Sequence, residues 1–398
     1  MLGHIFKMLW NRKSKNALIT IEVAISFIVV FALAAISIRY TWLYHQPLGY
    51  QYEDIWWIRI DNPEEWNQEK DRPTIQQMVT ALEQLPEVDS VHVISLPVFT
   101  FWSWKTNYKV DDKELFFNKN RMDDRSAQAM GMTISEGRWF GNQDAGQSYT
   151  AVVVNQLFAD EFYPGESIIG KNVASTEQQE QPAKEMRVVG VIKDFKQFGE
   201  LSEPVPYLIE RFDLAQDSGK GNERLHLKLN QKVTPEFEAK IISLLRNINP
   251  QWDYFARSLE QSRHSQLMET IIPIAIFAVI AFFLIIMVGM GLLGVLWQNV
   301  SRRTQEIGLR RALGATASMI HRQVIGELAV ICSLGITIAL LLLIQLPLLG
   351  VLPELNWTLF TTAAIVSVFF MLLLSFVCAY YPGKVATTYT PAMALHYE

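Results

Sequence analysis

The stretch Gly165–Asn172, with the sequence GESIIGKN, comes close to a phosphate-binding loop. Such a loop holds phosphates with backbone amides and a lysine, and a Ser or Thr hydroxyl reaches Mg²⁺. The glycine and lysine spacing is present, but Asn172 stands where the hydroxyl belongs. No strand signal leads directly into Gly165 and no helix signal follows Lys171. We therefore expect a glycine turn followed by a short strand, not a nucleotide site.

No other catalytic constellation is evident. The sequence has no H-E-x-x-H, C-x-x-C or G-x-S-x-G motif, and its seven histidines are scattered. His92, His226 and His264 lie far apart in the sequence, so a metal site is not expected. The net charge of −5 gives no reason to expect nucleic acid as a partner. We expect that the chain is not an enzyme and carries no cofactor of its own.

Four apolar stretches are long enough to cross a bilayer, which takes roughly 20 residues of helix. They are residues 17–38, 271–298, 317–346 and 358–380. Nearly uninterrupted apolar runs of this length are not typical of half-exposed helices in soluble proteins. A cleavable signal peptide is an alternative for the first stretch, with small residues at Ala32–Ala34. The apolar run continues past that point, which favours a span.

Positive charges flank the spans on one side, and such flanks stay in the cytoplasm. They are Lys7, Arg12, Lys13 and Lys15 before the first span, Arg302, Arg303, Arg310, Arg311 and Arg322 between the second and third, and Lys384 after the fourth. Both termini and residues 299–316 are therefore predicted inside, and residues 39–268 outside. Residues 1–16 are predicted to form an interfacial helix, and residues 381–398 a cytoplasmic tail.

The outer domain is predicted to have an α+β fold. A βαβ pattern at its start and a ββαβ pattern at its end suit one layered sheet that is split by an insertion. The predicted elements at the start are strand 55–60, helix 74–85 and strand 88–95. Those at the end are strands 206–211 and 225–229, helix 237–248 and strand 252–256. The insertion, residues 97–203, is predicted to be mainly β, with a polar loop at residues 175–184. The two cysteines, Cys332 and Cys378, lie in predicted spans, so no disulfide supports this domain.

The inner segment between the second and third spans is predicted to contain a short charged helix over 302–314. Arg303, Glu306 and Arg310 share one face of it, and Glu306 can pair with either arginine. Gly314 can end the helix in a left-handed conformation, and Thr316 can cap the next helix. From the residues alone, a solvated loop and a docking element both remain open.

Two acidic residues, Glu22 and Glu327, lie inside predicted spans. An acid within the membrane is a functional candidate. Both lie near the cytoplasmic end of their spans, so snorkelling or pairing with a nearby arginine is the structural alternative. In the second span, Gly289, Gly291 and Gly294 favour close packing of helices.

The inner segment, with Arg322, Gln323 and Glu327 after it, resembles the signature of FtsX/MacB-like ABC transporter permeases. The C-terminal stretch 381–395 resembles the tail of that family. In the outer domain, residues 153–155, 164–171 and 189–195 resemble the MacB periplasmic core domain. The resemblance covers essentially the whole chain and implies that the inner segment couples to an ATPase. The residues that it assigns to this coupling are Arg302, Arg303, Glu306, Ile307, Gly308, Arg310, Arg311 and Gly314.

The resemblance also implies the setting of the protein. MacB itself carries its ATPase in the same chain, whereas only sixteen residues precede the first span here. We therefore expect a permease subunit of a bacterial inner membrane. Its partners would be a separate cytoplasmic ABC ATPase dimer, which supplies ATP and Mg²⁺, and a second permease copy. Motion of the outer domain would then serve efflux or export, with a periplasmic adaptor and an outer-membrane channel as further partners. The alternative is a regulatory subunit that controls cell-wall hydrolases or senses peptides.

Overall fold

The computed structural model describes residues 13–62, 67–110, 113–173, 185–214, 224–234, 236–302 and 304–386. The predicted interfacial helix before Lys13, the polar loop at residues 175–184 and the tail after Ala386 lie outside these residues. The chain forms two compact units. One comprises Met1–Trp42 and Ile272–Glu398, and the other comprises Leu43–Ile271.

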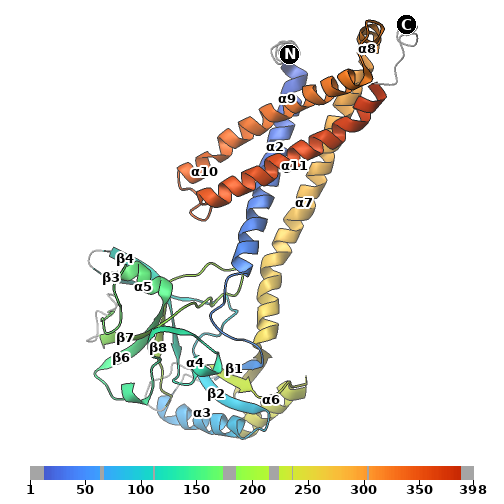
Figure 1. Cartoon of the computed structure of the whole chain (residues 1–398). Helices are drawn as coiled ribbons and strands as arrows, with labels where there is room; N and C mark the ends of the chain where they lie inside the picture. The colour runs from blue at the N-terminus through green and yellow to red at the C-terminus, as the bar shows by residue number, and fades with distance from the viewer. Residues whose placement is uncertain are drawn as a thin grey trace. The chain divides into compact units, whose positions relative to one another are not determined.

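The first unit is built from long apolar helices, drawn as the long ribbons in Figure 1. They are α2 (Lys13–Tyr44), α7 (Leu259–Arg302), α9 (Ala317–Leu343) with the short α10 (Gln345–Leu348), and α11 (Trp357–Ala386). In the described part of the chain, four helices are long and apolar enough to cross a membrane. The prediction of four spans is confirmed. Helices α2 and α7 both run beyond the apolar stretches that the sequence marked.

Small residues let these helices approach closely. A Cβ on Gly335 in α9 would lie 2.8 Å from Val23 Cγ1 and 2.9 Å from the Thr20 carbonyl oxygen in α2. Ala339 and Ala363 are fully buried in the same apolar core. Close approach at small residues is a common basis of helix packing in membranes. An ion pair between Arg39 and Glu354 joins α2 to the connection before α11.

The second unit is organised by one sheet in the order β10-β1-β9-β2-β4-β8-β6-β7-β5, with β3 paired to β4. Its strands are β1 (Ile55–Asp61), β2 (Val88–Ile94), β3 (Trp104–Val110), β4 (Lys113–Met122), β5 (Ile134–Gly137), β6 (Tyr149–Asn155), β7 (Glu185–Ile192), β8 (Tyr207–Arg211), β9 (Arg224–Leu229) and β10 (Asp253–Ser258). Most pairs are antiparallel, and β4–β8 and β6–β7 are parallel. A single pair, Ile94 with Met122, joins β2 to β4, so the sheet has two halves.

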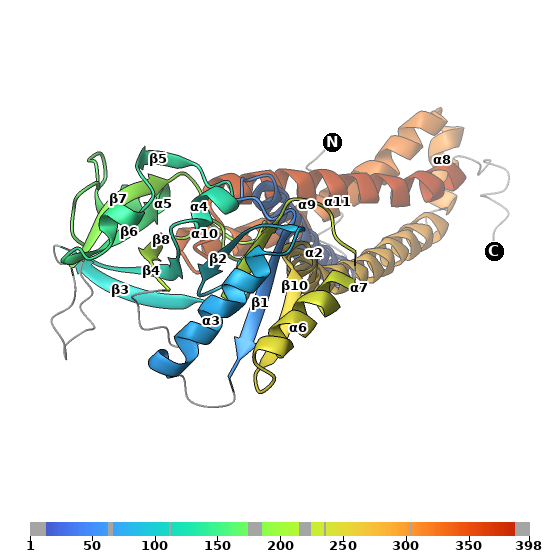
Figure 2. The same cartoon turned by 90° about the horizontal axis from the view of Figure 1, so that it is seen from below.

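The first half consists of β10, β1, β9 and β2. Helices α3 (Gln68–Glu83) and α6 (Glu236–Ile248) cover one of its faces, and Figure 2 shows them on either side of β1. Their apolar stripes bury Met78, Leu82, Ile241 and Leu245 against alternate residues of the strands. This packing follows from a helical period of 3.6 residues meeting a strand period of two.

The second half contains the insertion, with the short helices α4 (Ser126–Ala129) and α5 (Gln156–Phe162) among its strands. The predicted α+β class with a mainly β insertion is confirmed. One assignment was wrong: strand 206–211 was placed in the terminal layer, but β8 lies between β4 and β6 in the second half. The pairing of strands distant in sequence is not encoded in the local pattern of residues 206–211.

A buried lysine ties the start of the second unit to the first turns of α7. Lys196 Nζ donates hydrogen bonds to the Leu43 carbonyl (3.0 Å), in the last turn of α2, and to the Glu200 carbonyl (2.6 Å). The carboxylate of Glu200 pairs with Arg263 of α7. We call Lys196, Glu200, Arg263 and the Leu43 carbonyl the stalk latch. A cation at the C-terminal end of a helix satisfies carbonyls that have no partner within the helix.

Two buried histidines face each other across β2 and β9. His92 and His226 are register partners, their rings are 5.4 Å apart, and neither side chain is exposed. Among the described residues, both ring nitrogens of His92 and Nε2 of His226 have no hydrogen-bond partner. Burial lowers the pKa of His226 to about 3 and holds the pKa of His92 well below its usual value. Nearby positive charges add to the effect on His92.

These histidines should make the outer unit sensitive to acid. Because their folded pKa values are depressed, their contribution is present above the unfolded pKa of about 6.5 and is lost as the pH falls below it. The loss approaches about 1.4 kcal/mol per pH unit for each histidine. Burial raises the pKa of Asp123 to about 6, which opposes part of this loss. In the full chain, the double variant His92→Phe with His226→Phe should lose less unfolding free energy between pH 7 and 5 than the unsubstituted protein. Equal losses would contradict this account.

Candidate coupling site

The inner segment forms a helix, α8 (Thr304–Ala312), between α7 and α9. Arg302 is the last residue of α7, so the helix predicted over 302–314 is shorter than expected. Gly314 has φ of +97°, the left-handed conformation that favours glycine at a helix end. The Thr316 side chain accepts a hydrogen bond from the Met319 amide and caps α9. Arg303 lies outside the described residues.

Helix α8 is seated on a small apolar cluster. Ile307 is buried against Val300 of α7 and against Ile320 and Val324 of α9. The neighbouring Gly308 is buried as well. Burial of one isoleucine contributes roughly 1.5–3 kcal/mol. This contact fixes one face of α8 against the ends of two long helices.

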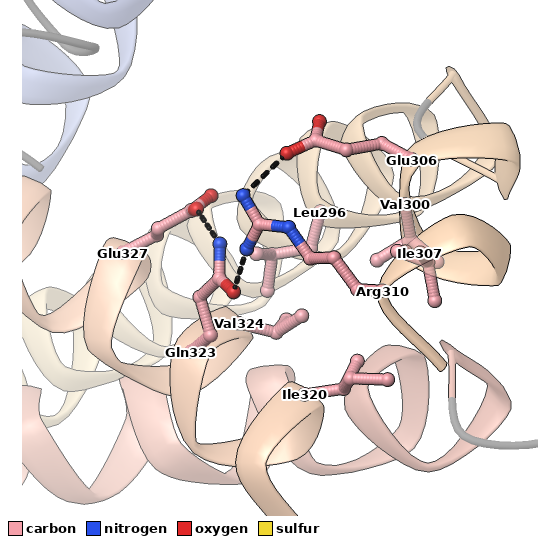
Figure 3. Close-up of a pocket in the computed structure, with 9 residues that line it drawn as sticks. All are labelled: Leu296, Val300, Glu306, Ile307, Arg310, Ile320, Gln323, Val324 and Glu327. Carbon is pink, nitrogen blue, oxygen red and sulfur yellow. Dashed lines mark hydrogen bonds and ion pairs between the residues drawn. The ribbon is translucent and has the colours of Figure 1, made fainter. Parts of the chain in front are cut away.

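A chain of polar contacts runs beside that cluster, as Figure 3 shows. Arg310 donates to Glu306 Oε1 and to Gln323 Oε1, each at 2.6 Å. Gln323 Nε2 in turn donates to Glu327 Oε1 at 3.1 Å. Of the two arginines that could pair with Glu306, the structure shows the pair with Arg310. The chain links α8 to the first turns of α9.

The same residues line a pocket of ≈ 30 Å³ between α7, α8 and α9. This space is comparable with that of a single water molecule and is too small for a substrate. Its lining is Leu296, Val300, Glu306, Ile307, Arg310, Ile320, Gln323, Val324 and Glu327. The arrangement therefore suits the positioning of α8 and not catalysis.

The other side of α8 is exposed and partly apolar. Leu309 is 59% exposed and Leu313 is 81% exposed, and Arg302 and Gln305 are also exposed. Leu309 and Leu313 thus give this side of α8 an exposed apolar part beside charged residues. We call Gln305 and Leu309 of α8, together with Leu313 directly after it, the outer face of α8.

The structure thus places Glu306, Ile307, Gly308 and Arg310 together where α8 packs against α7 and α9. Arg302 and Gly314 lie just before and just after α8. The position of the Arg311 side chain is not described. Gln323 and Ile320 were not among the residues predicted for coupling. The Gln323–Glu327 spacing of i,i+4 was a signal for their contact. Glu327 enters the site through this contact, whose donor is the Gln323 amide and not an arginine.

Glu22 lies elsewhere in the first unit. Its carboxylate occupies the space that a Cβ on Gly291 of α7 would need, with Oε1 2.7 Å from that position. Cys378 Sγ lies 3.6 Å from the Gly289 carbonyl oxygen, and a Cβ on Gly294 would meet nothing within 4 Å. Gly291 therefore serves close packing, whereas a Cβ on Gly289 would meet only ordinary contacts, from 3.6 Å to Cys378 Sγ, in the part of the chain described.

The groups of residues 165–172 that resemble a phosphate-binding loop are bound to other groups of the protein. Lys171 pairs with Glu166 at 2.5 Å, and its ammonium lies 3.8 Å from the centre of the Tyr163 ring. The Gly170 amide donates to the Val188 carbonyl at 2.8 Å. Asn172 forms an isolated bridge to Arg187, and its side-chain amide donates to Glu185 at 3.2 Å, so among the described residues the predicted short strand is reduced to one bridge. The lysine and an amide that a phosphate would need are engaged within the protein.

Comparison with known proteins places the chain in a family. Residues 17–243 match the MacB-like periplasmic core domain, and residues 278–391 match the FtsX-like permease C-terminal domain. The chain belongs to the FtsX/MacB-like family of ABC transporter permeases. The resemblance noted in the sequence is confirmed, and the second matched region contains α8.

Relatives of this permease include proteins named MacB. The macrolide export ATP-binding/permease protein MacB 2 of Yersinia pestis bv. Antiqua (strain Antiqua) is 24% identical over 327 residues, which cover 80% of this chain and 46% of that protein. MacB of Aggregatibacter actinomycetemcomitans is 24% identical over 211 residues, which cover 52% of this chain and 31% of that protein. The permease thus spans less than half the length of these two relatives.

Solved structures that align with this permease include two outer domains. The periplasmic region of MacB from Actinobacillus actinomycetemcomitans has a TM-score of 0.39 and 16% identity, over 54% of this chain and 93% of that one. The extracellular domain of the noncanonic ABC-type transporter YknZ from Gram-positive bacteria has a TM-score of 0.34 and 12% identity, over 50% of this chain and 99% of that one.

Proposed function

We propose that this permease couples ATP hydrolysis by a cytoplasmic ABC ATPase to motion of its outer domain, for export of a substrate. The observation that carries the proposal is the seat of α8. One face is held by Ile307 and Arg310 against α7 and α9, and the opposite face presents Leu309 and Leu313. A docking helix needs both an exposed face and a held face. The partner binds the exposed face, and the held face passes the displacement of α8 to α7 and α9.

The proposed displacement passes from α8 to α7 and along α7 to the stalk latch. The ATPase binds the outer face of α8 and shifts it. Helix α8 moves the ends of α7 and α9 through the Ile307 cluster and the Arg310–Gln323 contact. Helix α7 is one helix from Leu259 to Arg302, and its first turns hold Arg263 of the stalk latch. A continuous helix that is packed against Ile307 near one end and paired with Glu200 near the other is suited to carry such a displacement.

The wider assembly is part of the same proposal. ATP and Mg²⁺ bind the ATPase, whose two copies dock on two permease copies, and the complex lies in the bacterial inner membrane. The relatives are named as macrolide exporters, which favours export over control of hydrolases or peptide sensing. A periplasmic adaptor and an outer-membrane channel would complete an export route.

Affinity purification of the full chain tests this proposal most simply. A tagged permease should retain an ABC ATPase from its own cells, and ATP turnover should rise when the two are combined in nanodiscs. Recovery of the permease without any ATPase would exclude the proposal. Co-purification of a sensor kinase or hydrolase with the complex would favour the regulatory alternative.

Topology gives a separate prediction. A cysteine at Ser318, which is exposed in α9, should react with a membrane-impermeant reagent only when the inner side is opened. A cysteine at Ser243, exposed on α6, should react from outside. The native Cys332 and Cys378 are buried and serve as unreactive background. External labelling at Ser318 would overturn the orientation, which rests on the charge asymmetry of the flanks.

A further inference from the structure

The outer unit has a cleft of ≈ 520 Å³ on the face of β10, β1 and β9 that α3 and α6 do not cover. That volume lies within the usual range for small-molecule sites. Its floor carries Trp57 and Arg59 of β1, Arg224 of β9 and Arg257 of β10. The loop after β2 and the first turns of α7 form its walls.

The register of the strands concentrates positive charge on this floor. Arg59 faces Arg224 across β1 and β9, and Arg257 faces Trp57 across β10 and β1. Like charges directly opposite each other on a sheet are unfavourable. Arg59 is partly compensated by Asp61, at 2.8 Å, and Glu269 is the one acidic residue among the described residues that line the cleft. The lining therefore keeps an excess of positive charge.

Arg257 has a particular role in this arrangement. Its guanidinium donates hydrogen bonds to Ser265 and to the Gln261 carbonyl, both neutral groups of α7. Among the described residues, no carboxylate pairs with it. The guanidinium is thus oriented by neutral acceptors and keeps its charge for another partner. A planar guanidinium binds carboxylate and phosphate groups well.

The wall formed by the loop after β2 is aromatic and held in place. Phe101 is 60% exposed and Trp102 is 78% exposed. Their loop is fixed at both ends, because Asn120 exchanges two hydrogen bonds with Leu96 and Gln197 donates to the Trp102 carbonyl. Phe99, between these anchors, has φ of +58°, a conformation that a bulky residue adopts only when its surroundings impose it.

Trp57 completes an apolar surface on the floor. Its indole Nε1 donates to Ser262 Oγ at 2.9 Å, and its ring lies 5.4 Å from that of Phe255. The ring is therefore held in one orientation. Preorganised aromatic rings beside guanidinium groups suit a ligand with both an apolar and an anionic part.

We propose that this cleft binds an anionic amphiphile. Its carboxylate or phosphate contacts Arg257 and Arg59, and its apolar body lies against Trp57 and Trp102. The ligand could be a soluble molecule or the head group of an anionic lipid, since both carry this chemistry. The proposal does not depend on coupling to an ATPase, so each can fail without the other.

Photolabelling of the full chain in phosphatidylcholine nanodiscs tests the proposal. The probe is 4-benzoylbenzoate, which carries a carboxylate and two rings, and its uncharged amide is the control probe. Mass spectrometry should find saturable labelling on peptides 96–104 and 255–269 with the carboxylate, and none that saturates with the amide. Equal saturation with both probes would overturn the proposal.

Variants separate the two parts of the ligand. Arg257→Gln should raise the half-saturating concentration about tenfold, because a charged hydrogen-bond pair is lost. Trp102→Ala should raise it several-fold without unfolding the protein, because that side chain is largely exposed. The matched controls Arg246→Gln on α6 and Phe116→Ala on β4, both exposed and outside the cleft, should change nothing. Equal effects in the controls would remove the support for this site.

Competitors identify the source of the ligand. Suppression of labelling by hexyl phosphate supports a soluble amphiphile, and suppression by phosphatidylglycerol in the nanodisc supports a lipid head group. Inorganic phosphate should compete poorly. If it competes as well as hexyl phosphate does, the site holds simple anions and the amphiphile assignment is wrong.

Discussion

Leu313→Asp should weaken binding of the ATPase strongly and leave the permease folded. Leu313 is 81% exposed, so its loss removes no internal packing. In a docked complex, the new carboxylate would be desolvated without a partner. We expect a cost of about 2 kcal/mol or more, which corresponds to about a thirtyfold rise in Kd. The measurement is the affinity of the purified ATPase for the permease in nanodiscs. Leu157→Asp on α5, an exposed leucine of the outer unit, is the matched control and should bind normally.

Arg310→Met should have a different effect at the same site. It removes both hydrogen bonds of Arg310, to Glu306 and to Gln323, while the outer face of α8 is unchanged. After allowance for solvent screening of this partly exposed group, the seat should weaken by about 1 kcal/mol. The ATPase should still bind, but the permease should no longer stimulate ATP turnover fully. Arg322→Met, at an exposed position one residue before Gln323, should keep full stimulation. Equal turnover in the two variants would show that the Arg310 contacts carry no coupling.

Gly49→Ala should prevent the outer unit from folding stably. Gly49 has φ of +87°, and a Cβ there would lie 1.9 Å from the Asp194 carbonyl oxygen and 2.3 Å from its carbon. The left-handed conformation costs roughly 1–2 kcal/mol for a non-glycine residue. The clash is with backbone, so it can be relieved only by moving the chain beside Lys196 of the stalk latch. We expect a total loss of about 4 kcal/mol or more in unfolding free energy.

Gly170→Ala is the matched control for this substitution. Gly170 has φ of +80°, but a Cβ there would meet nothing within 4 Å. Gly170→Ala should therefore lose only the free energy that the left-handed conformation costs a non-glycine residue. Unfolding of the outer unit in the full chain, followed by tryptophan fluorescence, measures both variants. If they lose the same free energy, the close approach of Gly49 to Asp194 contributes nothing.

Much of the fold could be predicted because its signals are local. The four apolar runs mark the long helices by length alone. Gly314 and Thr316 mark the end of one helix and the start of the next, and the structure has both features at those positions. The same is true of Glu306 and Arg310, which are neighbours at i,i+4 on α8.

The features that sequence analysis missed depend on contacts between distant segments. Strand β8 could not be placed, because its partners β4 and β6 are separated from it by many residues. The hairpin of β3 and β4 went unpredicted, since KELFFNKNRM lacks a clear alternation of polar and apolar residues. The partnership of Arg310 with Gln323 requires α8 to fold back on α9. The stalk latch likewise unites Leu43, Lys196 and Arg263, which no spacing rule connects.

The central claim is that the state of the ATPase reaches the outer unit through α8. Hydrogen–deuterium exchange of the permease–ATPase complex in nanodiscs tests it most directly, with the ATPase trapped by ATP and vanadate. We predict that trapping changes exchange at the stalk latch, in peptides 43–52, 192–200 and 259–271, and that Arg310→Met loses this change although its ATPase still binds and traps nucleotide. An unchanged outer unit in the trapped complex, or the same change in Arg310→Met, would contradict the claim.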